Sequence, residues 1–128
     1  MGKGRTESVV AVWCLLWVAA RGAPDTRVVS YHCEGWTQAD SDYESAVDRV
    51  VRKLVMLTGD NGNDYLTYET VGKSTCFGHA FCEASLSATE CTSCLQAARN
   101  VQLVRCGFPV RAVMILRSCF LKFQEVIF

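Results

Sequence analysis

The stretch that decides the fold of this chain lies between residues 77 and 123. It reads FGHAFCEASLSATECTSC over 77–94, continues to Cys106 and ends in CFLKF over 119–123. Five cysteines therefore fall within 38 residues, at positions 82, 91, 94, 106 and 119. Cysteine at this density is typical of small exported domains, in which an oxidising compartment lets disulfides persist and supplement a small core.

The amino-terminal residues support export. Lys3 and Arg5 precede an apolar run over 9–20, and the small residues Ala20, Gly22 and Ala23 follow. This order is typical of a secretory signal peptide, and twelve apolar residues are too few to span a bilayer comfortably. We expect residues 1–22 to be the signal peptide and 23–128 to be one mature domain without a stable membrane anchor.

The charge of the expected mature chain argues against nucleic acid as a partner. The whole chain has thirteen basic and thirteen acidic residues, and residues 1–22 hold Lys3, Arg5, Arg21 and Glu7. Ten basic and twelve acidic residues remain, and no cluster of Lys or Arg occurs. A nucleic-acid-binding surface needs such a cluster to neutralise phosphates.

The cysteine count leaves the pairing open. Seven of the eight cysteines follow residue 22, and three bridges with one free thiol can be arranged in about 105 ways. Two other chemistries compete with disulfides. His79, Cys82, Cys91 and Cys94 are a ligand set for zinc, and Cys91 with Cys94 could be a redox pair at the start of a helix. Export favours disulfides over both alternatives, so we expect no metal site and no cofactor.

Two helices are predicted from capping patterns and periodicity. Ser41 and Glu44 form a capping box ahead of apolar residues at helical spacing, and Gly59 ends this helix. Ser87 and Glu90 repeat the box ahead of a second helix, which Gly107 and Pro109 end. The residues predicted to be buried are Tyr43, Val47, Val50, Val51, Leu54 and Leu57 on the first helix, and Cys91, Cys94, Leu95, Ala98 and Val101 on the second.

The remaining segments have the composition of strands. β-Branched and aromatic residues mark 65–71 as a strand, and 28–33 and 77–86 are also predicted to be strands. The tail from Val110 to Phe128 reads as a hairpin turning at Arg117-Ser118. Helices and strands that do not alternate strictly indicate an α+β fold. We expect two helices on one face of a four- to five-stranded antiparallel sheet.

The cysteine spacing, the segment Phe77-Gly78-His79-Ala80 and the closing Cys119-Phe120-Leu121-Lys122-Phe123 together resemble the plant ginkbilobin family. The same module occurs in cysteine-rich receptor-like kinases and plasmodesmata-located proteins. The likeness covers the chain from Cys33 onward. It implies three disulfides, Cys33 with Cys106, Cys82 with Cys91 and Cys94 with Cys119, and leaves Cys76 as a free thiol. That thiol is either a small buried apolar group or a group for intermolecular bridging.

The resemblance also implies a carbohydrate site. The family binds mannose with an Asn just after the first cysteine, an Arg six residues before the last and a Glu five residues after it. The matching residues here are Glu34, Val113 and Gln124, so none is retained. Because strand residues two apart share a face, Arg111 could replace the lost arginine and meet Glu34 and Gln124. Tyr31 and Trp36 could stack on a sugar ring, although aromatic residues in so small a domain are more often in the core.

The resemblance therefore suggests a secreted plant defence protein in the apoplast, antifungal and lectin-like, that binds a cell-wall or fungal glycan. The alternative is a non-lectin module that binds an extracellular protein or forms a homodimer through its sheet. We expect no catalysis, because His32 and His79 lack evident partners in the sequence. His79 is interpreted as a structural histidine.

Overall fold

The computed structural model describes residues 23–36 and 40–128, so the predicted signal peptide lies outside the described residues. These residues form two α-helices, a short 3-10 helix and a five-stranded antiparallel sheet, which confirms the predicted α+β fold. The elements are β1 (Val28–Trp36), α2 (Ser41–Leu57), η1 (Gly59–Asn61), β2 (Asp64–Val71), β3 (Ser74–Cys82), α3 (Ala88–Arg105), β4 (Pro109–Leu116) and β5 (Cys119–Gln124).

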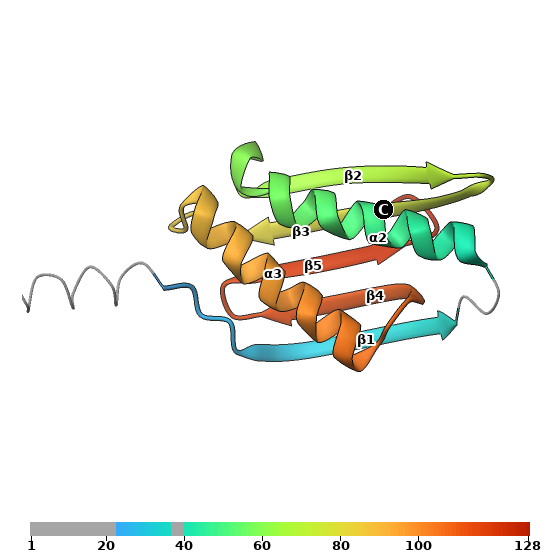
Figure 1. The fold of residues 1–128 in the computed structure, drawn as a ribbon. Helices are drawn as coiled ribbons and strands as arrows, with labels where there is room; N and C mark the ends of the chain where they lie inside the picture. Colours follow the sequence, from blue (N-terminus) through green and yellow to red (C-terminus); the bar gives the residue numbers. More distant parts are fainter. Residues whose placement is uncertain (1–22, 37–39) are drawn as a thin grey trace, which may run out of the picture.

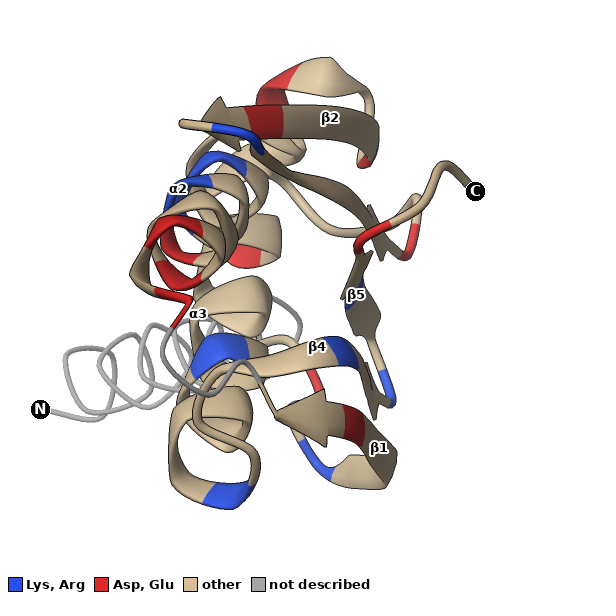
Figure 2. Ribbon diagram, turned by 90° about the vertical axis from the view of Figure 1, so that its right-hand side faces the viewer, with Lys and Arg blue, Asp and Glu red and all other residues tan. Residues whose placement is uncertain are grey.

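The strands lie in the order β1-β4-β5-β3-β2, and every neighbouring pair is antiparallel. Both helices cover the same face of this sheet, α2 across β2 and β3 and α3 across β4 and β5 (Figure 1). Among the described residues no helix lies on the opposite face, and the C-terminal segment lies on that side (Figure 2). The molecule therefore has a covered inner face and an outer face of different chemistry.

The first helix begins one residue earlier than predicted, because its N-cap is Asp40 and Ser41 is its first helical residue. The side chain of Asp40, not Ser41, accepts a hydrogen bond from the Tyr43 amide at 2.9 Å. Aspartate is an N-cap acceptor as good as serine, so the earlier residue takes this role. Leu57 was also predicted wrongly, because it is 36% exposed in the last turn while Val55 is buried.

The second helix has the predicted capping box, with Ser87 and Glu90 bonded to each other's backbone amides. These hydrogen bonds from Ser87 hold the pKa of Glu90 below its ordinary value. The helix ends as predicted, since Gly107 has φ +66° and donates its amide to the Gln102 carbonyl. Gln102, not Val101, is fully buried, and its Nε2 donates to the Gly107 carbonyl.

The third strand runs from Ser74 to Cys82, four residues earlier at its end than the predicted 77–86. Residues 83–86 form a turn, in which the Leu86 amide bonds to the Glu83 carbonyl. The core between the sheet and the helices is close-packed at β3. Gly78 lies directly under α2, where a Cβ atom would be 2.2 Å from Val50 Cγ1.

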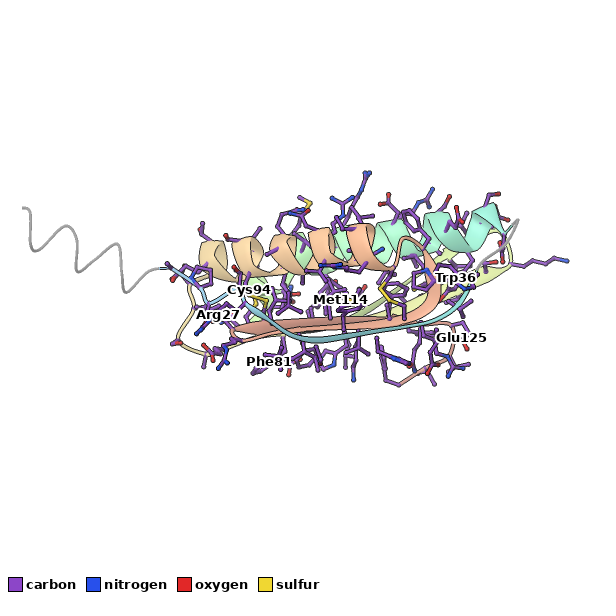
Figure 3. The ribbon with its side chains drawn as sticks, turned by 90° about the horizontal axis from the view of Figure 1, so that it is seen from below. Arg27, Trp36, Phe81, Cys94, Met114 and Glu125 are labelled. Carbon is purple, nitrogen blue, oxygen red and sulfur yellow. A yellow bond between two sulfur atoms is a disulfide. The ribbon has the colours of Figure 1, made fainter. Side chains whose placement is uncertain are left out.

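The three disulfides of the described residues are those that the family resemblance implies: Cys33–Cys106, Cys82–Cys91 and Cys94–Cys119. Each has one cysteine within α3 or at its C-cap and the other in a strand. The sulfur atoms lie between the helices and the sheet, on the same side as Met114 (Figure 3). The covalent framework therefore lies on the inner face and leaves the outer face without a disulfide.

Candidate functional site

The residues predicted to contact sugar share the outer face of the sheet. Ala112, Met114 and Phe123 are buried in the core, so the alternating residues Arg111, Val113 and Gln124 face away from the helices. Glu34 follows Cys33, which turns inward to its disulfide, and pairs in register with Arg111. The structure thus brings the four positions, 34, 111, 113 and 124, to one surface formed by β1, β4 and β5.

Arg111 is the centre of this surface. Its Nε donates to both carboxylate oxygens of Glu125, at 2.9 and 3.0 Å, and its Nη2 bonds the same carboxylate. Its Nη1 lies 3.8 Å from Oε2 of Glu34. The Arg111 side chain is 48% exposed and that of Glu34 is 53% exposed, so the pair is open to a ligand. Arg111 meets Glu34 as predicted, but its hydrogen bonds go to Glu125 instead of Gln124.

Glu125 is the residue that the sequence reasoning missed. It is one position beyond the matched Gln124, on the same side of the sheet as Phe81 (Figure 3). Hydrogen bonds from Arg111 hold the pKa of the Glu125 carboxyl below its ordinary value, and Glu125 in turn raises the pKa of Arg111. The one signal in the sequence was the position of Glu125, an acidic residue directly after Gln124.

The other two matched positions contribute less. Gln124 donates through Nε2 to the Val126 carbonyl at 2.9 Å, which fixes the C-terminal turn. Val113 lies between His32 on β1 and Lys122 on β5, and its side chain has no polar atom. A ligand at this surface would therefore be held mainly by Arg111 and the two glutamates.

Both histidines have carboxylate partners that the sequence did not reveal. His32 Nε2 lies 2.8 Å from Oε1 of Glu34, and His79 Nε2 lies 2.7 Å from Oδ1 of Asp64. The His79 ring also meets the edge of Phe120, with centroids 5.2 Å apart. Within the described part of the chain, neither imidazole is hydrogen-bonded to a hydroxyl or a thiol, the arrangement that nucleophilic catalysis requires.

The two aromatic residues near Glu34 are not in the core. Trp36 is 69% exposed at the end of β1, and Tyr31 is 46% exposed. Tyr31 and Val28 line a groove of about 500 Å³ between β1 and α3, on the helix side of the sheet. The prediction that such residues are core residues is therefore wrong, and Tyr31 lies on the other side of the sheet from Arg111.

The disulfides use the cysteines that the zinc and redox hypotheses require. Cys82, Cys91 and Cys94 are all in disulfides, and Cys91 is not paired with Cys94 as a redox motif would require. Cys76 is free and fully buried, with the Tyr43 hydroxyl 3.8 Å from its sulfur. Burial raises the pKa of the Cys76 thiol to about 12. A protonated, inaccessible thiol is a packing group and not a site for intermolecular bridging.

The described residues contain no helix long and apolar enough to cross a bilayer. Residues 32–126 match the sequence profile of the salt stress response/antifungal family, which covers most of the chain. The chain belongs to this family. It is 26% identical to antifungal protein ginkbilobin-like protein 1 of Picea sitchensis over 128 residues, covering 98% of this chain and 96% of the relative. It is 29% identical to antifungal protein ginkbilobin-2 of Ginkgo biloba over 108 residues, covering 80% of this chain and 79% of that one.

Two solved structures of the family's fold match as well. They are the tandem DUF26 ectodomains of the Arabidopsis thaliana cysteine-rich receptor-like proteins PDLP8 and PDLP5. The TM-scores are 0.67 and 0.62, the sequence identities 24% and 22%, and the matches cover 83% and 82% of this chain. The chain spans about half the length of each ectodomain, 48% and 47%. The likeness establishes the fold that the cysteine pattern predicted.

Proposed function

We propose that this member of the antifungal family is a secreted, non-catalytic carbohydrate-binding protein that holds sugar hydroxyls between Arg111, Glu34 and Glu125. The observation that supports the proposal is the 3.8 Å separation of Arg111 Nη1 and Glu34 Oε2. This distance is too long for a direct hydrogen bond. A sugar hydroxyl placed between the two residues can accept from Arg111 Nη1 and donate to Glu34 Oε2.

The rest of the cluster suits this chemistry. Glu125 occupies Nε and Nη2 of Arg111 and fixes the guanidinium plane, so the Nη1 donors point in a defined direction. His32 occupies Oε1 of Glu34 and leaves Oε2 as an acceptor. A polyol presents hydroxyls that both donate and accept, which matches a fixed cation beside a carboxylate.

The proposal keeps the chemistry of the family's site while moving its residues. The arginine comes from β4, as at the matched position Val113, but lies two residues earlier at Arg111; the carboxylate comes from Glu125, one residue after the matched position Gln124 at the end of β5. The site is therefore displaced along the sheet. A preference for mannose-type glycans is the expectation to be tested first.

The test is retention of the secreted protein on immobilised mannan, followed by elution with free mannose and a screen of other cell-wall glycans. Arg111→Gln should abolish retention, because it removes the Nη1 donors without changing the strand. Arg52→Gln is the matched control, since Arg52 is a 63% exposed arginine paired with Asp48 on α2. Failure of the wild-type protein to bind any glycan, or equal retention of Arg111→Gln, would contradict the proposal.

A further inference from the structure

The outer face carries a second surface that the carbohydrate site does not use. Apolar and aromatic side chains of β2, β3, β5 and the C-terminal segment gather there, and several are widely exposed: Leu66 and Tyr68 62% each, Phe81 38%, Ile127 76% and Phe128 45%. We call this surface the aromatic face; its residues are Leu66, Tyr68, Phe77, Phe81, Phe120, Ile127 and Phe128. The core does not need them, because the buried residues of these strands point to the helices.

The side chains of the aromatic face are packed against one another. The rings of Phe81 and Phe120 stack with centroids 5.7 Å apart, and Tyr68 and Phe77 lie 6.0 Å apart. Phe77 also lines a groove of about 350 Å³ with Leu66, Tyr68, Ile127 and Phe128. The surface is thus continuous and preformed, which lowers the ordering cost of a partner that docks on it.

We infer that the aromatic face is the interface through which two copies of this chain form a twofold symmetric dimer. The strand spacing of about 4.8 Å and rise of about 3.4 Å per residue give this part of the sheet an area on the order of 500 Å². With the surrounding polar rim it approaches the roughly 800 Å² per partner of a standard interface. An exposed apolar patch of this size, rimmed by polar groups, marks an interaction site.

The charges on this surface favour a second copy over other partners. Lys122 lies on β5 beside His79, and its ammonium is 4.8 Å from the Phe128 ring centroid. Asp64 lies two strands away on β2, with a 60% exposed side chain that gives Oδ1 to His79. A twofold axis in the interface plane, crossing β3 between these two residues, puts Lys122 of each copy over Asp64 of the other. Each contact is then made twice, as an isologous interface requires.

Other occupants fit less well. An anionic membrane surface favours several Lys or Arg side chains, whereas here the charge of Lys122 is offset by Asp64, two strands away on the same face. A polysaccharide needs donors and acceptors along its length, whereas four of the seven residues that define this face are phenylalanines. In the dimer, Arg111 lies toward the β1 edge, away from the axis, so each copy keeps its outer-face charge cluster accessible.

The test is sedimentation velocity of the secreted protein from about 1 to about 200 µM, without sugar, which makes it independent of the carbohydrate proposal. We expect a monomer–dimer equilibrium, weakened at least about tenfold by Tyr68→Glu and by Lys122→Glu, which is about 1.4 kcal/mol. Combining Lys122→Glu with Asp64→Lys should restore much of the affinity, because the ion pair is reversed. Val104→Glu is the control, at a 79% exposed position on α3.

Circular dichroism melting of each variant separates loss of association from loss of folding. A monomer at every concentration would overturn the inference, as would a dimer that Tyr68→Glu leaves unchanged. Failure of the charge reversal to recover affinity would overturn the twofold arrangement. Binding to phosphatidylserine vesicles or to insoluble glucan by a protein that stays monomeric would assign the aromatic face to that partner instead.

Discussion

The packing of α2 on β3 makes a sharp prediction at Gly78. In Gly78→Ala the new Cβ would lie 2.2 Å from Val50 Cγ1 and 2.9 Å from Leu54 Cδ1, whereas carbon atoms at optimal separation are about 3.5 to 4.0 Å apart. Val50 and Leu54 are fully buried and have no free space into which to turn. β3 is hydrogen-bonded to β2 on one side and β5 on the other, so the strand cannot recede.

Two effects of opposite sign decide how far Gly78→Ala changes the free energy of unfolding. Replacing glycine by alanine inside a regular strand is ordinarily favourable by roughly 0.5 to 1 kcal/mol, because it reduces the entropy of the unfolded chain. Overpacking a close-packed core costs about 1 to 3 kcal/mol. The clash spans more than an ångström, so we expect the cost to dominate, with a net loss of about 1 to 2 kcal/mol. For a domain near 100 residues this lowers the melting temperature by roughly 5 to 15 °C.

The assay is urea unfolding followed by far-ultraviolet circular dichroism, on four proteins: wild type, Gly78→Ala, Val50→Ala and the double variant. Val50→Ala removes the methyl group that the new Cβ would meet. Gly78→Ala should therefore cost less in the Val50→Ala background, with a coupling energy of about 0.5 to 3 kcal/mol. Equal or greater stability of the single Gly78→Ala variant, or strictly additive costs, would refute the reasoning.

Three further predictions concern charge and sulfur. Because Arg111 depresses the pKa of Glu125, the stability lost in Glu125→Gln should be up to about 1 kcal/mol at pH 7. This loss should shrink progressively as the pH falls below the ordinary glutamate pKa of about 4.3, measured by thermal melting from pH 7 to pH 3. The Cys76 thiol should resist a thiol reagent at pH 8 in the native protein and react in guanidinium; prompt native reaction would contradict its burial. Of the three disulfides, loss of Cys33–Cys106 should lower the unfolding midpoint most, because its 73-residue separation predicts about 4.5 kcal/mol, against about 3 kcal/mol for the shortest loop.

Local patterns in the sequence predicted the fold well where one strong physical signal acts. The Ser87–Glu90 capping box and the left-handed Gly107 both lie where the sequence placed them. The predictions failed where two local signals competed. Asp40 and Ser41 are both good N-caps, and in the structure Asp40 accepts the capping hydrogen bond. The strand predicted to end at Leu86 ends instead at Cys82, because residues 83–86 contain no β-branched or aromatic residue and the Leu86 amide closes a turn on Glu83.

The candidate site was harder to predict because its residues come from different strands. Sequence spacing placed Arg111 on the same face as Glu34, since strand residues two apart share a face. It could not identify Glu125, because that residue follows the end of β5, where the alternation of β-sheet side chains no longer applies. The partner of His79 was hidden for a related reason: Asp64 is distant in sequence and reaches the imidazole from the first residue of β2.

The distribution of the disulfides explains how the outer face can change while the fold persists. All three bridges connect α3 or its C-cap to strands β1, β3 and β5, so the cross-links act on the inner side of the sheet. Side chains of the outer face project away from these bridges and from the core. Replacing them alters surface chemistry at little cost in packing, because exposed substitutions seldom change stability by more than about 0.5 kcal/mol. A fold built this way can vary the residues of its outer face and keep its architecture.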